Sequence, residues 1–572
     1  MKSIISLLGN IKKKYLISIL IFLQITTILD VVSLSLIIPI MHVIINIESI
    51  NELKFFREYF VFLTKFSQTQ ILISILLIFA AINVMKSSIY VFLNYRIHQF
   101  AKYFNQTVSN KILIYYLTEN YENILNNKNS SLIRNITEET ERTTYAVINL
   151  LSLITEIIMM TLILGFIFYI DSVSISLVIL TTVLGVFFFK VIINKKLTEW
   201  SSMRQKMFGR RLSKITDSIQ AFIEINLLNK SVKTAEEYHK INETYFNKLI
   251  NYLVVQSLPR FIVEFFALLG ICLALIFMIE RGFDTHQILS SLAVLAAGAL
   301  RLLPGFNKVY SCIVSFSFSK PSVKLIRDEL RKASNLKLKL KNFDKNFTFK
   351  ESIILNKISF KYLNSIKILD KVDIQINKGD TLGIKGSSGS GKSTLVKIIM
   401  GILPPSKGQV LIDNTDLTGY DDKHSFYDKI AYVAQSVYLF NDTIKNNIAF
   451  CEDQKILSKE EEERLKKAIE VAQLEKFINN SPNKLDTMVG ENGIKISGGQ
   501  KQRIGIARAL YLNREILILD EATNSLDLDT ESKILQNIKN NFNRLTIIMI
   551  SHRVNNYEIC NKIFDLDKNK NI

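Results

Sequence analysis

The chain has 572 residues, of which 48% are hydrophobic and 22% charged, and its formal net charge at pH 7 is +19. This length exceeds one ordinary domain, and the apolar content excludes a disordered or fibrous chain. The mean hydropathy of +0.20 is high for a soluble enzyme and indicates membrane spans. The cysteines are widely spread without a CxxC pair, which excludes a disulfide scaffold and indicates reduced free thiols.

The first half of the chain predicts an α-helical membrane domain over residues 1–320. Each of its long apolar stretches reaches the roughly 20 residues that a helix needs to cross the hydrocarbon core. The first stretch follows a lysine triplet without a small-residue cleavage site, so we interpret it as a retained span. The six predicted spans lie near residues 15–47, 70–97, 147–170, 172–194, 252–279 and 286–315.

Basic residues beside the spans predict their orientation. Segment 195–214 carries seven Lys or Arg residues against one acid, Glu199, whereas the loops at 171 and 280–285 are short. The N-terminus and the long loops are therefore expected to be cytoplasmic, and these loops explain the basic charge better than nucleic-acid binding does. Because the long loops are polar with helical periodicity, we expect the spans to continue into the cytosol, with a cytosolic partner touching the turns near 128–136 and 219–229.

The predicted external segment between the first two spans, residues 51–68, is too short to cross the membrane. Its apolar residues recur at helical spacing with charges between them, which favours an amphipathic helix on the outer membrane surface. An ordinary packed helical loop is the alternative. The apolar positions are Leu53, Phe56, Phe60, Leu63 and Phe66.

The C-terminal part changes to a different pattern. Residues 321–349 form a charged linker, and short β-type runs separated by helical stretches follow it. This alternation predicts an α/β nucleotide-binding domain over residues 350–572.

A glycine-rich loop follows the strand-like run DTLGIK and precedes a helix-like run. Glycines let backbone N–H groups surround phosphates, while Lys392 can reach the β- and γ-phosphates and the Ser393 hydroxyl can ligate Mg²⁺. The sequence therefore predicts an ATP site. The predicted contacts in this loop are Gly386, Ser387, Ser388, Gly389, Ser390, Gly391, Lys392, Ser393 and Thr394.

The run EILILDE, residues 515–521, predicts a buried parallel strand that ends in two carboxylates. Acids at the carboxyl end of such a strand face the ligand crevice. We expect Asp520 to hold Mg²⁺ through water and Glu521 to orient and polarise the attacking water. A solvated strand end is the alternative, which the glycine-rich loop disfavours.

Between these motifs, Ile496 precedes a small-residue turn that opens a strong helix. Its serine hydroxyl and backbone amides offer a second phosphate-binding surface. The turn resembles the LSGGQ signature of ATP-binding-cassette proteins, with Ile496 as the apolar anchor where leucine is usual. The signature residues predicted to contact ATP are Ser497, Gly498, Gly499 and Gln500.

Other elements resemble the cassette motifs in order. The resemblance implies that Tyr362 stacks on adenine and that Gln435 binds Mg²⁺ and couples it to the membrane part. It also implies that Asp527 lies in the D-loop at the ATP site and that His552 contacts the γ-phosphate. Residues 489–493 (VGENG) resemble a loop specific to exporters.

The resemblance also implies an assembly. Two cassettes close head to tail, and the P-loop of one and the signature of the other sandwich ATP. A chain with one cassette and six spans is a half-transporter. The expected form is therefore a homodimer of type IV, exporter-type fold in a bacterial inner membrane. ATP closes the cytoplasmic cassettes and hydrolysis resets them.

Basic residues inside or at the inner edge of the spans suggest what is moved. Ionisable residues within spans are costly and usually functional, and a cluster of cations suits an anionic headgroup such as a pyrophosphate. The candidate substrate residues are Lys86, Arg260, Arg301 and Lys308. Ion pairs with intramembrane acids are the alternative, and these acids are Asp30, Glu156 and Glu264.

Segments 259–264 and 299–308 resemble those of PglK-type flippases, which also have an external helix between their first two spans. That family moves polyprenyl-pyrophosphate-linked oligosaccharides to the outer leaflet for glycosylation. Lysine stands for arginine at Lys86 and Lys308, which keeps the charge but loses the bidentate fork. The alternatives are an exporter of peptide, drug or lipid A and, more distantly, an ATP-gated channel or a regulatory membrane ATPase.

Overall fold

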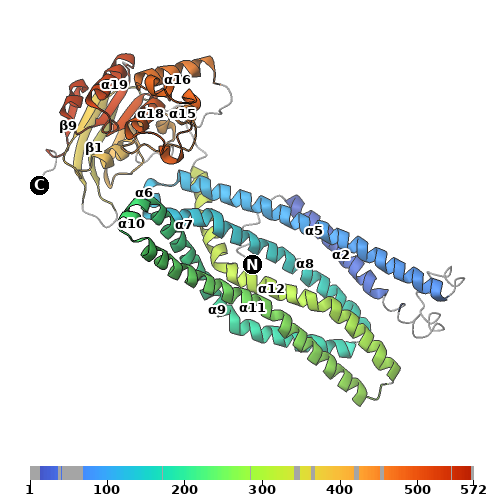
Figure 1. Cartoon of the computed structure of the whole chain (residues 1–572). Helices are drawn as coiled ribbons and strands as arrows, with labels where there is room; N and C mark the ends of the chain where they lie inside the picture. The colour runs from blue at the N-terminus through green and yellow to red at the C-terminus, as the bar shows by residue number, and fades with distance from the viewer. Residues whose placement is uncertain are drawn as a thin grey trace. The chain divides into compact units, whose positions relative to one another are not determined.

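The computed structural model divides into two compact units (Figure 1). Unit 1 comprises Met1–Glu119 and Asn126–Ser334, and unit 2 comprises Asn120–Leu125 and Asn335–Ile572. The predicted external helix at 51–68 lies outside the described residues, apart from Gln68. The structure describes residues 13–36, 40, 68–170, 172–283, 285–339, 348–362, 367–417, 424–450, 457–542 and 544–568.

Unit 1 is a bundle of long helices, which Figure 1 shows running beside one another. The helices α5, α9, α11 and α12 have 51, 49, 50 and 55 residues, more than twice what a span needs. They therefore continue well beyond the predicted spans. The bounds are α2 (Lys13–Ser35), α5 (Gln68–Thr118), α8 (Thr140–Ile170), α9 (Ser172–Gln220), α11 (Ser231–Glu280) and α12 (Thr285–Lys339).

Three of the described helical stretches are long and apolar enough to cross a membrane: Leu72–Thr118, Asn129–Gly165 and Ser231–Glu280. A shorter apolar stretch covers Ile17–Ser33. The helix α12 passes through Pro304 and Pro321 without ending, so the first part of the predicted linker continues this helix.

Short elements connect α5 to α8 and α9 to α11. The helix α6 (Tyr121–Asn126) is followed by α7 (Asn129–Arg134) and the π-helix η3 (Asn135–Glu139), while α10 (Phe222–Leu227) follows α9. The expectation that a cytosolic partner touches the turn near 128–136 stays a prediction. The structure groups residues 120–125 with the C-terminal unit.

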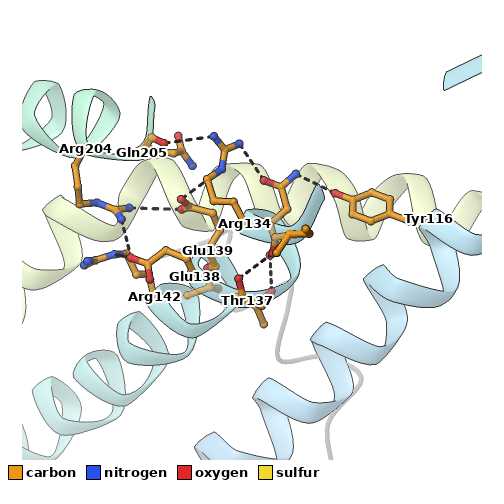
Figure 2. A network of polar contacts seen from close by, with 12 residues as sticks. Tyr116, Arg134, Thr137, Glu138, Glu139, Arg142, Arg204 and Gln205 are labelled. Carbon is orange, nitrogen blue, oxygen red and sulfur yellow. Dashed lines mark hydrogen bonds and ion pairs between the residues drawn. The ribbon is translucent and has the colours of Figure 1, made fainter. Parts of the chain in front are cut away.

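A cluster of charged residues, the Arg–Glu cluster (Arg134, Glu138, Glu139, Arg142 and Arg204), lies in unit 1, with Glu139 and Arg204 buried and the other three half-buried (Figure 2). Glu138 Oε1 accepts hydrogen bonds from Arg142 Nε at 2.7 Å and from Arg204 Nη1 at 2.9 Å. The Glu139 carboxylate lies 3.6 Å from Arg204 Nη2 and 3.9 Å from Arg134 Nε, without a hydrogen-bond partner among the described residues.

The Arg–Glu cluster joins several helices. Arg134 also donates to the Gln205 carbonyl of α9 at 3.3 Å, and Asn135 donates to the Tyr116 hydroxyl of α5 at 2.9 Å. The guanidinium groups of Arg142 and Arg204 each lie 5.7 Å from the ring centre of Phe318 on α12. Because Tyr116 precedes α6 and Arg134 follows it, these contacts fix the chain on both sides of α6.

Unit 2 contains two sheets. The antiparallel sheet has the order β2-β1-β4-β5, and its strands are β1 (Ser352–Phe360), β2 (Leu369–Asn377), β4 (Lys407–Ile412) and β5 (Thr415–Asp416). The parallel sheet has the order β6-β7-β8-β3-β9, and its strands are β3 (Thr381–Lys385), β6 (Ile430–Val433), β7 (Ile516–Asp520), β8 (Thr546–Ile550) and β9 (Lys562–Asp565).

Helices cover the parallel sheet on both faces, which is why β7 and β8 are continuous apolar runs with every residue buried. One hydrophobic core packs β7 and β8 against α16 (Lys459–Val471), α18 (Gly498–Tyr511) and α19 (Leu528–Asn541). The other joins the antiparallel sheet to α13 (Lys392–Ile399).

Candidate active site

The candidate site lies where parallel strands end together. Asp520 pairs in register with Ile550, and Val433 pairs with Leu519, so β6, β7 and β8 reach the same edge of the sheet. The strand β3 joins this edge beside β8. The loops that leave these ends carry the P-loop, Gln435, Glu521 and His552, which is the placement expected for a ligand crevice.

The P-loop turns sharply between β3 and α13. Gly391 caps α13 at φ 106°, and a Cβ there would lie 2.6 Å from the Ile368 side chain. Only glycine fits this conformation and space. Lys392 Nζ donates to the carbonyl oxygens of Gly386 and Ser387, both at 2.9 Å, which holds the ammonium group inside the loop.

Ser393 and Asp520 provide a fitting place for Mg²⁺. The Ser393 hydroxyl donates to Asp520 Oδ1 at 3.2 Å, and the Tyr432 hydroxyl donates to Oδ2 at 3.2 Å. Hydroxyl and carboxylate oxygens are the hard ligands that Mg²⁺ prefers, and Mg²⁺ needs few protein ligands when phosphates and waters complete its shell. Burial raises the pKa of Asp520, and the two hydrogen bonds only partly offset this.

Glu521 is held by uncharged amides and an imidazole. Gln435 Nε2 donates to its Oε2 at 2.7 Å, Asn524 Nδ2 donates to the same oxygen at 2.9 Å, and His552 Nε2 lies 3.0 Å from Oε1. Its backbone has φ 52°, in the left-handed region that non-glycine residues seldom adopt. Such strain is often found where a side chain is aimed for chemistry.

Two further predicted ATP contacts sit at the edges of the P-loop. The Tyr362 hydroxyl is 3.4 Å from Thr394 Oγ1, which places its ring beside the start of α13. The backbone N–H of Ser387 donates to Asp567 at 2.6 Å and its hydroxyl donates at 2.9 Å, so this side chain is engaged by the segment after β9.

The signature residues form a helix cap. The Ser497 hydroxyl accepts from the Gln500 N–H at 3.3 Å, and Gln500 Oε1 accepts from the Ser497 N–H at 2.9 Å, a capping box at the start of α18. Ile496 packs against the core, in agreement with its predicted role as an apolar anchor.

The signature and the D-loop form one structure. The Ser525 N–H donates to Gln502 of α18 at 2.8 Å, and a Cβ at Gly499 would lie 3.1 Å from the Ser525 carbonyl oxygen. Asp527 caps α19 by accepting from the Thr530 N–H. The predicted residues thus form two groups. The P-loop group combines the P-loop with Gln435, Asp520, Glu521 and His552, and the signature group combines residues 497–500 with Asp527.

The predicted substrate cations have different environments. Lys86 Nζ lies 3.2 Å from the buried Asp30 carboxylate and donates to Asn83 at 2.8 Å, so it takes part in the ion pair that we considered as the alternative. Lys308 is exposed on α12. The side chains of Arg260 and Arg301 lie outside the described residues.

Sequence reasoning missed Tyr432, Asn524 and Asp567. Tyr432 lies on β6, three residues before Gln435, and Asn524 lies three residues after Glu521. Proximity to the motifs was a usable signal for these two. Asp567 follows Ser387 by 180 residues, and only the pairing of β3 with β9 brings them together.

Residues 369–524 match the family model described as ABC transporter. An ATP-dependent lipid A-core flippase of Francisella novicida is 29% identical over 451 residues, which cover 77% of this chain and 73% of that protein. A flippase of the same name from Desulfotalea psychrophila is 40% identical over 222 residues, which cover 39% of this chain but only 38% of that protein.

Among solved structures, a bacterial Atm1-family ABC exporter with ATP bound aligns with a TM-score of 0.75 at 20% identity. The alignment covers 98% of this chain and 94% of that chain. The predicted exporter-type fold, a membrane helical domain followed by an α/β nucleotide-binding domain, is therefore confirmed.

Proposed function

We propose that the chain, which matches the ABC transporter family model over residues 369–524 and has the fold of an ABC exporter, is a half-transporter that works as an ATP-driven exporter of a phosphate-bearing glycolipid in a bacterial inner membrane. One observation carries the ATPase part of this proposal. At one edge of the sheet, Lys392 is held inside the P-loop, Ser393 donates to Asp520, and Gln435 and His552 contact Glu521, the residue after Asp520.

Each of these residues has a role in hydrolysis. Lys392 binds the β- and γ-phosphates, while Ser393 and Asp520 hold Mg²⁺, with Gln435 able to join them through its amide oxygen. When bound, Mg²⁺ neutralises charge on the phosphates. Glu521 orients the attacking water and accepts its proton, and His552 holds the Glu521 carboxylate in place.

The partner in the working assembly is a second copy of this chain. The signature is built onto the D-loop rather than onto its own P-loop, so the P-loop group needs a signature from elsewhere. The short helix α10 also presents apolar side chains that one copy leaves uncovered, with Phe222, Ile223 and Leu227 exposed to 66%, 67% and 78%. A second cassette provides both the missing signature and a cover for this turn.

The substrate proposal is a lipid with a phosphorylated headgroup. Relatives that align over 77% of this chain are named lipid A-core flippases, and lipid A carries phosphate. The cations in segments 259–264 and 299–308 resemble those of flippases for polyprenyl-pyrophosphate-linked oligosaccharides. Both lipids present an anionic head that Arg260 and Arg301 can bind by bidentate hydrogen bonds.

The decisive experiment measures ATP-dependent flipping in proteoliposomes, with one set containing a polyprenyl-pyrophosphate oligosaccharide and another containing lipid A-core. The control protein is Glu521→Gln. Flipping of either lipid by the wild type alone supports the proposal and identifies the headgroup. Robust ATPase activity without flipping of either lipid contradicts the substrate proposal and leaves the ATPase proposal standing.

A second variant tests the cations. Arg260→Ala combined with Arg301→Ala removes both proposed headgroup contacts and is expected to impair flipping while the basal ATPase activity is largely retained. Lys86→Ala serves for comparison because its ammonium group is paired with Asp30. Unchanged flipping by the double variant contradicts a headgroup role for the arginines.

A further inference from the structure

Tyr432 lies directly beside the proposed metal site. It is on β6, three residues before Gln435, and its hydroxyl donates to Asp520 Oδ2 at 3.2 Å. Ala431 and Val433, the residues before and after Tyr432, are buried in the hydrophobic core that contains α16, α18 and α19. Because successive side chains of a strand point to opposite faces of the sheet, Tyr432 lies on the other face. This face leads to the end of β7, where Asp520 lies.

The two oxygens of Asp520 are held from different elements. Oδ1 accepts from Ser393 at the start of α13, and Oδ2 accepts from Tyr432 on β6. A Ser393 oxygen that bound Mg²⁺ through a lone pair could still donate its hydrogen to Oδ1. Tyr432 is the described donor on the other oxygen, so it fixes the carboxylate against rotation.

We propose that Tyr432 is a positioning residue that fixes the Asp520 carboxylate for Mg²⁺ through a hydrogen bond that does not involve Gln435. The inference rests on the proposed ATPase function but not on the identity of the lipid. It assigns Tyr432 no contact with ATP or with the attacking water.

The test uses the full-length protein in nanodiscs and Tyr432→Phe, which keeps the ring and removes only the hydroxyl. The affinity for Mn²⁺ is measured by electron paramagnetic resonance in the presence of a non-hydrolysable ATP analogue. The loss of one hydrogen bond to a charged group predicts about tenfold weaker Mn²⁺ binding, with affinity for the metal-free analogue unchanged. Tyr438→Phe is the matched control, because Tyr438 follows on the same segment and is 59% exposed.

Equal Mn²⁺ affinity in Tyr432→Phe and wild type overturns the positioning role, even if ATPase activity falls. Because the readout is metal binding, a failure of lipid flipping leaves this conclusion intact.

Discussion

Two pairs of adjacent acids, one in each unit, are held in opposite ways. In unit 2, Asp520 and Glu521 receive hydrogen bonds from hydroxyls and amides and a contact from an imidazole. In unit 1, Glu138 and Glu139 face the arginines of the Arg–Glu cluster (Figure 2).

The difference follows from what each pair can do. Guanidinium groups neutralise a carboxylate and hold it in a fixed salt bridge, which suits a joint between helices. Hydroxyls and amides fix the orientation of a carboxylate but leave its negative charge available to a metal ion or a proton. The kind of donor therefore distinguishes an acid that serves chemistry from one that serves architecture.

The largest expected effect is on turnover. Glu521→Gln keeps the size of the side chain and removes its basicity, so hydrolysis should fall by about 10²-fold or more while ATP binding is retained. Phosphate release and binding of a fluorescent ATP analogue measure the two properties. Normal turnover in this variant would refute the assignment of Glu521 as the base.

In unit 1, the comparison predicts a loss of stability instead. Glu138→Gln removes the negative charge that accepts two charge-assisted hydrogen bonds and leaves the buried Arg204 without its closest counter-charge, so it should cost about 3–5 kcal/mol. Glu139→Gln should cost less, because neither oxygen accepts a hydrogen bond from the described residues. Thermal unfolding in detergent ranks the two variants, and a larger effect at Glu139 would contradict the ranking.

Asn524→Ala removes one of the two amides that donate to Glu521 Oε2, and Gln435 remains. A single hydrogen bond to a charged acceptor is worth about 1.5–3 kcal/mol, and because Gln435 compensates in part, we expect a decrease in kcat of about tenfold. Asn524→Asp, which is of equal size and adds a charge beside Glu521, should be more harmful. Steady-state ATPase assays compare the two, and equal rates for both variants and the wild type would exclude a role for Asn524.

The smallest expected effect concerns Asp413, a carboxylate outside the candidate active site that accepts hydrogen bonds from backbone N–H groups. Burial would raise the pKa of Asp413, but backbone N–H groups of Lys350, Ser352 and Glu351 outweigh it and hold the pKa below its ordinary value. A carboxyl whose pKa is lower in the folded protein than in the unfolded chain stabilises the fold at pH values above the unfolded-state pKa. This stabilisation is lost as the pH falls through the folded-state pKa.

Asp413→Asn should therefore destabilise the protein by about 1 kcal/mol at neutral pH, with the difference from wild type shrinking in acid. Hydrogen exchange of the Glu351 and Ser352 amides, followed by mass spectrometry, measures the effect locally. ATPase activity should remain at the wild-type level. A destabilisation that grows toward acid pH would contradict the sign.

Several features of the site were predictable from the sequence because they depend on short segments. The P-loop needs glycines at the turn before a helix, and Gly391 shows why, with its positive φ and its close neighbour Ile368. The capping box of Ser497 and Gln500 likewise depends on a spacing of three residues. The buried strand that ends at Asp520 is visible as a continuous apolar run.

Other features depend on contacts between distant parts of the chain. Tyr432 reaches Asp520 across 88 residues because β6 and β7 pair in register. Arg204 reaches Glu138 across 66 residues because α9 packs against α7 and α8, which flank η3. From the sequence alone, Lys86 could bind a lipid headgroup or form an ion pair with an acidic residue. The packing of α2 against α5 places the Asp30 carboxylate 3.2 Å from Lys86 Nζ.

The sequence by itself determined that the chain has apolar spans followed by an α/β nucleotide-binding domain, because the periodicity of apolar residues and the spacing within loops are local properties. Only the tertiary structure decided which donor holds which carboxylate and that residues 120–125 belong with unit 2. These outcomes depend on strand register and helix packing, which bring together residues whose distance along the chain carries no information about their distance in space.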